Sequence, residues 1–496
     1  MSELPGRNDA CWVDGAPSTR YPKYARSDRT EIAVVGGGIV GLTAAYLLAR
    51  AGRDVTVIEA MRIGRGVTGR STAKVTSQHA LTLSQIARES GKERARLYAE
   101  ANQAGVEAIL RLAADLRIDC DLEPRNAYAY TLRKARRSAI EREARLAREL
   151  GMPAAFQACA PLPFDNEGAV VYRDQAQFNP VKYLVGLARA IRAAGGRIFE
   201  NTRVADIEPK KGLWRIGVGR HSLTATKVVS ATHLPLGAPL PFDEHTQPRC
   251  HAAMAFRAPA DALDGMFIDV DRAAHSLRLA HDAKGPLVVA LAPEFFTGHL
   301  GDVAACFRAL EQWVRARLPV GEPAWRWINE DYDSPDAVPF AGELAKKAPG
   351  LFVATGFGGW GISNGTAAAM LIADQIQGRK SAWSALYDPE RRSHNINEGG
   401  DTKTPADNVD DIAPGEGAVV THGRKKIAVW KAADGRAHAL DAACTHKGCT
   451  VSWNNADQTW NCPCHGSMFS CDGGVLHGPA TEPLKPVRIP AGARRG

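Results

Sequence analysis

EIAVVGGGIVG, at residues 31–41, is the stretch that determines the fold. A short β-branched run, typical of a buried strand, leads into consecutive glycines, and LTAAYLLARAG (42–52) continues as an apolar helix. DVTVIEA (54–60) follows and is typical of a second strand. The turn between the first strand and the helix carries the pattern G-x-G-x-x-G at Gly36, Gly38 and Gly41.

Each residue type in this turn has a physical reason. The first glycine permits a tight turn, the second lets the backbone approach a pyrophosphate, and the third packs the helix against the strand. The helix N-terminus attracts the negative charge. Glu59 ends the second strand 23 residues after Gly36, where an acidic side chain accepts a hydrogen bond from a ribose hydroxyl. The unit is therefore predicted to bind a dinucleotide.

A second glycine turn occurs late in the chain, at Gly356, Gly358 and Gly361. It also lies between an expected strand, LFVAT (351–355), and an expected helix, NGTAAAMLIADQIQ (364–377). A second NAD site would need another strand with an acidic end about 20 residues further on. Gly378-Arg379-Lys380 stand there instead. We therefore expect one dinucleotide unit and a second glycine turn in the same domain.

Composition excludes several classes of protein. The 496 residues are 45% hydrophobic and 23% charged, which predicts two to four globular domains and not a disordered chain. The net charge of +8 is small for this length, and arginine-rich stretches such as 134–150 also carry glutamates, so we expect no nucleic-acid partner. The apolar run 32–49 contains the glycine turn, and the N-terminus lacks the pattern of a signal peptide. We expect no transmembrane segment and a cytoplasmic location.

The remaining chain mixes helices and strands. A single amphipathic helix is expected over about 84–118, and RIFENTRVADIEP (197–209) is expected to form a strand. Residues 248–330 alternate in a way that suits an antiparallel second domain. A polar stretch at 388–407 predicts a linker, and the short strands and Gly/Pro turns beyond it predict a small all-β domain.

Cysteines concentrate near the C-terminus, where five of the ten lie within 28 residues. Cys444-x-His446 and Cys462-x-x-His465 supply two thiolates and two imidazoles. Zinc in a Cys₂His₂ site is one interpretation of these four residues. The segment Cys-Pro-Cys-His-Gly-Ser (462–467) and the extra cysteines beside the ligands oppose zinc.

Residues 1 to about 380 resemble the glycine/D-amino-acid-oxidase superfamily of FAD enzymes. The resemblance rests on the GGGIVG turn, Glu59, the loop IGRGVTGRSTAKVTSQH (63–79), RVADIEP (203–209) and ATGFGGWGISNG (354–365). It implies that the loop and the late turn surround the flavin, with a helix dipole favouring the anionic reduced flavin. The implied flavin-contacting residues are Gly69, Arg70, Ser71, Thr72, Lys74, Val204, Gly356, Gly358, Gly361 and Ile362. His79 either contacts or covalently carries the flavin, or is an ordinary hydrogen-bonded loop histidine.

Residues 408–490 resemble the Rieske [2Fe–2S] domain. The resemblance implies that Cys444 and Cys462 hold one iron and that His446 and His465 hold the other. It also implies a disulfide between Cys449 and Cys464, a hydroxyl of Ser467 that hydrogen-bonds a bridging sulfide, and a closing loop at Gly478-Pro479-Ala480. Phe469 departs from the family pattern, since a tyrosine usually stands there. The lost hydrogen bond is expected to lower the cluster potential.

The expected architecture is an α/β Rossmann-like FAD-binding domain with an α+β antiparallel-sheet substrate domain, followed by a small all-β Rieske domain. The oxidoreductase part would span 1–387, with FAD binding at about 28–85, 178–235 and 335–380 and the substrate domain at about 86–177 and 236–334. A linker at 388–407 and the Rieske domain at 408–496 would follow.

Two redox centres on one chain imply electron transfer between them. We expect a flavin-dependent dehydrogenase of a small substrate, whose electrons pass singly through the cluster to an external one-electron carrier. The combination resembles a bacterial group of FAD oxidoreductases with a C-terminal Rieske domain, with Trp12, Gln78-His79 and Thr232-His233 among the matching residues. Reverse electron flow, an NAD(P)H-dependent reductase and a redox-sensing binding protein stay open as alternatives.

The substrate class is predicted from one position. In the superfamily an arginine that clamps the substrate carboxylate commonly stands five residues before the Asp of D-x-x-P-x-x-G, which is here Asp336 to Gly342. That position holds Asp331, and a carboxylate there would favour a neutral or cationic group. We therefore expect an amine-type substrate. Arg278 and His281 are further candidates for substrate contact, and Arg326 would serve only if the register slips.

Overall fold

The dinucleotide unit forms the centre of a parallel sheet. The computed structural model describes residues 4–400 and 402–489. In it β2 (Asp28–Val35) lies between β3 (Val55–Ile58) and β11 (His221–Ser230), and β8 (Arg197–Phe199) and β19 (Leu351–Thr355) extend the sheet in parallel on either side. β18 (Phe340–Glu343) closes one edge antiparallel to β19. The hairpin β9 (Asp206–Lys210) and β10 (Leu213–Val218) pairs with β11.

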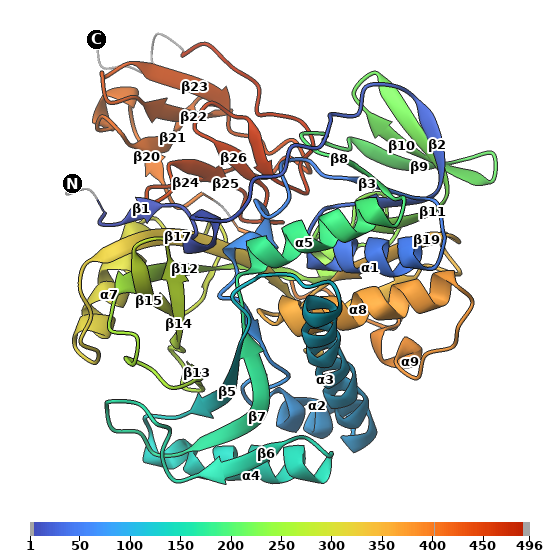
Figure 1. Ribbon diagram of the computed structural model, residues 1–496. Helices are drawn as coiled ribbons and strands as arrows, with labels where there is room; N and C mark the ends of the chain where they lie inside the picture. The colour runs from blue at the N-terminus through green and yellow to red at the C-terminus, as the bar shows by residue number, and fades with distance from the viewer. Residues whose placement is uncertain (1–3, 401, 490–496) are drawn as a thin grey trace.

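Helices cover one face of this sheet. Ile32 and Val34 of β2 point into a core shared with α1 (Ile39–Arg50), α5 (Pro180–Ala193) and α8 (Gly361–Ile376), which lie side by side in Figure 1. The alternate residues Ala33 and Val35 point into a second core that includes β10 and β11. Both faces are thus buried, which accounts for the uninterrupted apolar run of the strand.

A second, larger sheet lies beside the first, and its strands follow the order β1-β17-β12-β15-β14-β13-β5-β7-β4. Most of its pairs are antiparallel, as expected, but β13 pairs with β5 and β1 with β17 in parallel. The bounds are β1 Arg7–Asn8, β4 Lys74–Val75, β5 Glu123–Tyr130, β7 Ala169–Gln177, β12 Gln247–Arg257, β13 Met266–Asp269, β14 Ser276–Asp282, β15 Gly285–Leu291 and β17 Pro323–Asp333. Helices α4 (Arg137–Glu149) and α7 (Ala304–Arg315) pack on its strands.

Two expected elements are each divided in the structure. The helix expected over 84–118 is two helices, α2 (Thr82–Ser90) and α3 (Lys92–Asp115), because Gly91 adopts φ +92° and ends the first. The expected strand 197–209 is split into β8 and β9, which belong to different parts of the sheet. The helix α3 packs against α8 and α2.

Residues 405–477 form two small all-β sheets. One contains β20 (Pro405–Ala406), β21 (Gly417–His422), β22 (Lys425–Lys431) and β23 (Ala437–Asp441). The other contains β24 (Ser452–Asn454), β25 (Thr459–Asn461), β26 (Met468–Ser470) and β27 (Val475–His477). Figure 1 shows this region, in orange to red, lying over the two larger sheets. Among the described residues, no helix combines the length and hydropathy needed to cross a bilayer.

Candidate functional site: a dinucleotide cavity beside a cysteine–histidine centre

Three glycines of the first turn differ in what surrounds them. Gly36 has φ +111°, and a Cβ there would lie 2.3 Å from the carbonyl oxygen of Ala231. A Cβ on Gly41 would lie 2.0 Å from the carbonyl oxygen of Gly36. Gly38 is different, because a Cβ there would have only the Thr68 hydroxyl within 4 Å, at 3.2 Å. Gly36 and Gly41 therefore serve the chain's own packing, whereas Gly38 leaves room for a ligand.

That room is a cavity of about 540 Å³ that begins at this turn. Its walls come from the turn, the 63–79 loop, the late glycine turn and strands of the large sheet. Most of the residues predicted from the sequence lie on it, namely Gly36, Gly38, Glu59, Gly69, Ser71, Thr72, Lys74, Val204, Asp331, Gly358, Gly361 and Ile362. An extended cavity with a helix N-terminus at each glycine turn fits a dinucleotide.

Glu59 is held at the end of β3 by two backbone donors. Its Oε2 accepts from the Gly37 N–H at 2.7 Å, and its Oε1 accepts from the Met61 N–H at 2.8 Å. Burial raises the pKa of this carboxyl above its usual value. Each carboxylate oxygen can accept a second hydrogen bond, so the residue suits a ribose hydroxyl.

Lys74 brings a titratable amine to the cavity. Its Nζ donates to the carbonyl oxygen of Phe267 at 2.8 Å and to the Ser276 hydroxyl. Burial, assisted by the charge of Arg278, lowers the pKa of Lys74 to about 7. The amine can therefore hold or release a proton near neutrality.

Three residues that the resemblance placed at the flavin, Arg70, His79 and Gly356, do not line the cavity, and neither does Gly41, which packs helix on strand as expected. Gly356 (φ +76°) shapes the late turn, and Arg70 donates to the carbonyl oxygen of Ile328. His79 is buried, with Nδ1 2.7 Å from the Tyr98 hydroxyl and Nε2 2.9 Å from that of Ser363. Burial lowers the pKa of His79 to about 3. Both ring nitrogens have partners, which favours the hydrogen-bonded loop histidine.

Asp331 lies on the cavity, and each of its two oxygens already accepts at least one hydrogen bond. Its Oδ1 accepts from His233 Nε2 at 3.1 Å and from the Tyr332 N–H at 2.7 Å, and its Oδ2 accepts from the Gly359 N–H at 2.6 Å. Burial raises the pKa of Asp331, but the hydrogen bond and charge of His233 bring it below its usual value. The carboxylate thus positions the late glycine turn, and its contact with a substrate amine stays a prediction.

The other two substrate candidates are placed elsewhere. Arg278 is buried and donates to the carbonyl oxygens of Thr72, Ala73 and Leu279, so it supports the 63–79 loop from behind. His281 is largely exposed, and its Nδ1 lies 3.8 Å from Glu123. Neither residue lines the cavity. No motif supports either residue as a substrate contact, and the fold directs both side chains away from the cavity.

An arginine that the sequence argument missed does lie at the late glycine turn. Arg249 of β12 stands directly across from Asp331 of β17, and its Nη2 would lie 3.3 Å from a Cβ on Gly359. Its charge is matched by Glu294 and by Asp333, whose Oδ1 is 2.9 Å from Nε. The pairing runs between strands 82 residues apart in the chain, so no local pattern could have indicated it.

The cysteine–histidine residues converge from two loops of the small β region. His446 Nδ1 and His465 Nδ1 are 3.3 Å apart, and burial lowers the pKa of His465 to about 4, which keeps the ring neutral as a metal ligand must be. The thiols of Cys444 and Cys462 interact, and the hydrogen bond from Cys462 is the main reason that the pKa of Cys444 falls to about 7. The two imidazoles therefore face each other, as do the two thiols.

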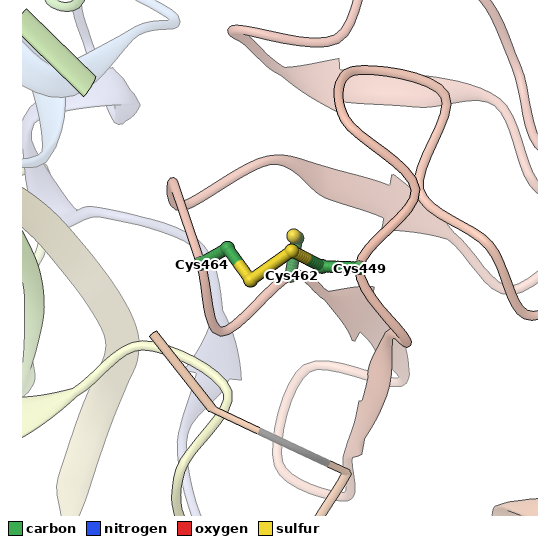
Figure 2. A group of neighbouring side chains, drawn as sticks. All are labelled: Cys449, Cys462 and Cys464. Carbon is green, nitrogen blue, oxygen red and sulfur yellow. A yellow bond between two sulfur atoms is a disulfide. The ribbon is translucent and has the colours of Figure 1, made fainter. Parts of the chain in front are cut away.

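The predicted disulfide is present. Cys449 and Cys464 are joined at 2.05 Å, which ties together the two loops that carry the predicted ligands. Figure 2 shows Cys462 beside this bond. The Cys462 sulfur lies within 4.8 Å of both disulfide sulfurs. A sulfur in a disulfide has no thiolate to offer, so this cysteine group is not a separate metal site.

Ser467 and the closing loop complete the centre. The Ser467 hydroxyl is buried, accepts from the Ala480 N–H at 3.0 Å and interacts with Cys444. Phe469 is fully buried in the same core. The hydroxyl thus lies beside the sulfur of a predicted ligand, and its hydrogen bond to a bridging sulfide stays a prediction.

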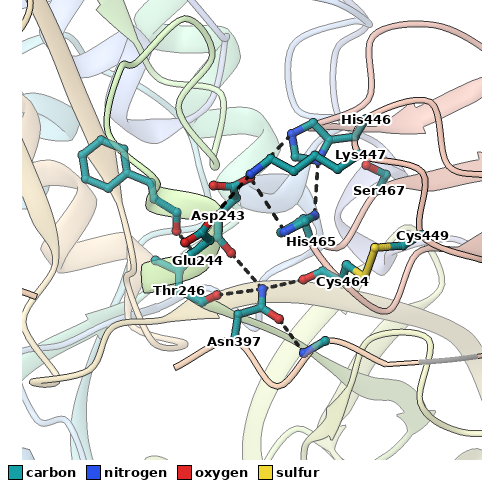
Figure 3. Close-up of polar contacts among 12 residues, drawn as sticks. Asp243, Glu244, Thr246, Asn397, His446, Lys447, Cys449, Cys464, His465 and Ser467 are labelled. Carbon is teal, nitrogen blue, oxygen red and sulfur yellow. Dashed lines mark hydrogen bonds and ion pairs between the residues drawn. A yellow bond between two sulfur atoms is a disulfide. The ribbon is translucent and has the colours of Figure 1, made fainter. Parts of the chain in front are cut away.

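The histidine edge of this centre faces the dinucleotide part of the chain. Asp243 of α6 (Phe242–His245) has its Oδ2 3.8 Å from His446 Nε2 and 3.7 Å from His465 Nε2, and Lys447 Nζ is 2.5 Å away (Figure 3). Asn397 of the connecting segment bonds the carbonyl oxygens of Asp243 and Cys464. Asn397 of the expected linker therefore contacts both parts of the chain.

The two sites share a wall. The segment 476–481, which includes the predicted closing loop, lines the dinucleotide cavity. Tyr332 of β17 donates to the carbonyl oxygen of His465 at 2.9 Å, and a Cβ on Gly466 would lie 2.4 Å from Glu330 Oε1. Because Gly466 has no side chain, its loop packs directly against β17, and the two sites lie next to each other.

Comparisons with known proteins agree with both sites. Residues 31–375 match the model of the FAD dependent oxidoreductase family, and residues 402–488 match that of the Rieske [2Fe-2S] domain. The chain is 29% identical to the Rieske 2Fe-2S iron-sulfur protein YhfW of Bacillus subtilis (strain 168) over 96% of this chain and 97% of that protein. It is 30% identical to gamma-glutamylputrescine oxidoreductase of Escherichia coli (strain K12) over 36% of this chain and 43% of that protein.

The fold has solved counterparts. Glycine oxidase from Geobacillus kaustophilus superposes with a TM-score of 0.60 and 19% identity, covering 73% of this chain and 99% of the oxidase. The expected fold class and both cofactors are thereby confirmed. This chain belongs to the FAD dependent oxidoreductase family and carries a C-terminal Rieske [2Fe-2S] domain.

Proposed function

We propose that the protein oxidises a small amine-type substrate at FAD and passes the electrons singly through its Rieske cluster to an external carrier. The observation that carries this proposal is the shared wall, in which the Rieske segment 476–481 lines the cavity of the two glycine turns. When bound, FAD supplies two-electron chemistry, while the cluster supplies one-electron chemistry. Adjacent centres support transfer within one chain.

Residues of this chain would divide the work as follows. The turn at Gly36–Gly41 and Glu59 would hold the dinucleotide end, and the N-terminus of α8 at Gly361 would favour negative charge at the opposite end. Lys74, with its pKa lowered to about 7, would give a proton to, or take one from, a molecule bound in the cavity. Cys444, His446, Cys462 and His465 would hold the irons.

The amine class is supported by charge and by one relative. Arg249, the cation at the late glycine turn, already faces Glu294 and Asp333, so no unmatched arginine awaits a substrate carboxylate there. The gamma-glutamylputrescine oxidoreductase that matches part of the chain is named for an amine-containing compound. We retain a cytoplasmic location as part of the proposal, because the cysteines outside the Rieske domain are free thiols.

Anaerobic mixing tests the direction of flow. Protein with both cofactors is mixed with a panel of amines, and flavin bleaching and the cluster's reduced EPR signal are followed. We expect an amine to bleach the flavin first and the cluster signal to follow. Rapid bleaching by NADH alone would favour a reductase, and a cluster that substrate never reduces would contradict electron transfer through it.

Substrate charge gives a second prediction. Glycine and D-alanine are expected to reduce the flavin poorly, because Arg249 is neutralised. In the double variant Glu294→Gln/Asp333→Asn, Arg249 is freed, and the KM for D-alanine should fall about tenfold, equivalent to about 1.4 kcal/mol. Steady-state kinetics with D-alanine measure this. Efficient turnover of glycine or D-alanine by the unaltered protein would contradict the amine assignment.

The cluster potential gives a third prediction. Phe469→Tyr should raise the midpoint by about 40 mV, the one-electron equivalent of a hydrogen bond of about 1 kcal/mol, and Ser467→Ala should lower it similarly. Redox titration followed by EPR measures both. Unchanged midpoints in both variants would mean that neither side chain reaches a cluster sulfur.

A further inference from the structure

Three ligand-type side chains meet at the border between the oxidoreductase part and the Rieske domain. His233 follows β11, Glu330 belongs to β17, and His477 ends β27. His477 Nε2 lies 3.3 Å from His233 Nδ1 and 3.1 Å from Glu330 Oε2. All three atoms lie within 4.8 Å of one another. None of the three belongs to the predicted cluster ligands.

The protonation state of His233 is determined by its other neighbour. Its Nε2 faces Asp331 Oδ1 at 3.1 Å, and a carboxylate can only accept, so Nε2 carries the proton. The Nδ1 of the neutral ring then presents a lone pair to His477. A buried carboxylate that fixes the tautomer of a histidine in this way is the usual outer partner of a metal-binding imidazole.

The three atoms that face one another are His233 Nδ1, His477 Nε2 and Glu330 Oε2, and they have too few protons to hydrogen-bond all of them. Glu330 Oε1 accepts from the Thr297 hydroxyl at 3.0 Å, but Oε2 is buried and has no hydrogen-bond partner among the described residues. Only His477 Nε2 faces it, and one N–H cannot satisfy both Glu330 and His233 Nδ1 fully. If His233 carried a second proton, on Nδ1, that N–H would donate to His477 Nε2. His477 Nε2 would then have no proton to donate to Glu330 Oε2. A bound cation satisfies all three lone pairs at once.

Charge points the same way. Glu330 is 4% exposed and Asp331, the next residue, is 5% exposed. Two adjacent buried carboxylates are costly unless cations or donors compensate them. Asp331 has three donors, whereas Glu330 Oε2 is faced only by His477 Nε2, at 3.1 Å, among the described residues.

We propose that His233, Glu330 and His477 bind one divalent transition-metal ion of the zinc type, with Asp331 as the outer partner of His233. Two imidazoles and one carboxylate, with a fourth position open, match zinc sites that keep a water or ligand. His233 and His477 line the cavity, so the open position faces it. The ion would join the oxidoreductase part to the Rieske domain. This site does not depend on the proposed substrate or direction of electron flow.

Zinc binding tests the site directly. Protein carrying both cofactors is dialysed against micromolar ZnCl₂, and zinc and iron are measured by mass spectrometry. We expect one zinc per chain beside an unchanged iron content, which excludes zinc entry into the cluster site. His477→Asn and Glu330→Gln should each weaken binding at least about 100-fold, and Asp331→Asn about 10- to 100-fold.

The matched control is His299→Asn. His299 lies at the same border and faces the carbonyl oxygen of Pro463 at 3.3 Å, but it is outside the three-residue group. This variant should bind zinc like the unaltered protein. Equal zinc binding by His477→Asn, or no zinc bound by the unaltered protein at micromolar concentration, would overturn the proposal.

Thermal unfolding provides a second readout. Because the ion would join two parts of the chain, zinc should raise the melting temperature of the unaltered protein by a few degrees and leave that of His477→Asn unchanged. Equal shifts in both proteins would place the zinc elsewhere. FAD and iron contents, measured on the same samples, test the proposed function separately.

Discussion

Gly38→Val is expected to yield a folded protein that retains its iron–sulfur cluster and lacks FAD. A Cβ at this position meets only the Thr68 hydroxyl, at a tight 3.2 Å that a small shift of the Thr68 side chain relieves, but a branched side chain fills the space the pyrophosphate needs. FAD content falls from one per chain to nearly none, measured by the absorbance of the released flavin, while iron content stays the same.

Two comparisons sharpen this result. Gly38→Ala adds a single carbon and should weaken FAD binding less than valine does. Gly41→Val should instead reduce the yield of folded protein, because its Cβ would lie 2.0 Å from the Gly36 carbonyl oxygen. Stoichiometric FAD in Gly38→Val would refute the placement of the pyrophosphate.

His446→Ala is expected to abolish the cluster and leave FAD bound. The two Nδ1 atoms 3.3 Å apart are placed to hold one shared iron, and removing His446 leaves that iron with only one of its two protein ligands. The Cys449–Cys464 disulfide still joins the loops, so the domain should remain folded. Iron and acid-labile sulfide assays and the EPR signal measure the loss, and flavin absorbance measures the retained FAD.

Lys447→Ala is the matched control, since this exposed neighbour contacts Asp243 but offers no ligand. It should keep its cluster. Full iron content in His446→Ala, or stoichiometric zinc without iron in the unaltered protein, would exclude the predicted ligand set.

Sequence patterns succeeded where a short segment carries its own chemistry. The turn at Gly36–Gly41 and the acid at Glu59 predicted the cavity because strand, turn and helix are contiguous. The Cys-x-His and Cys-x-x-His segments, through their resemblance to a known domain, predicted the disulfide that the structure contains. The break at Gly91 was not predicted, because the helical spacing of apolar residues continues on both sides of it. Only the structure shows that Gly91 adopts φ +92°, which ends the first helix.

The sequence by itself determined the dinucleotide turn and the cysteine–histidine pattern, because each depends on residues close together in the chain, and the family resemblances of its segments indicated both cofactors. Only the tertiary structure decided which charged groups meet. It placed Arg249 opposite Asp331, turned Arg278 and His281 away from the cavity, and brought His477 to His233. These pairs form across strands and between domains, where sheet register and close packing set the distances and no local spacing records them.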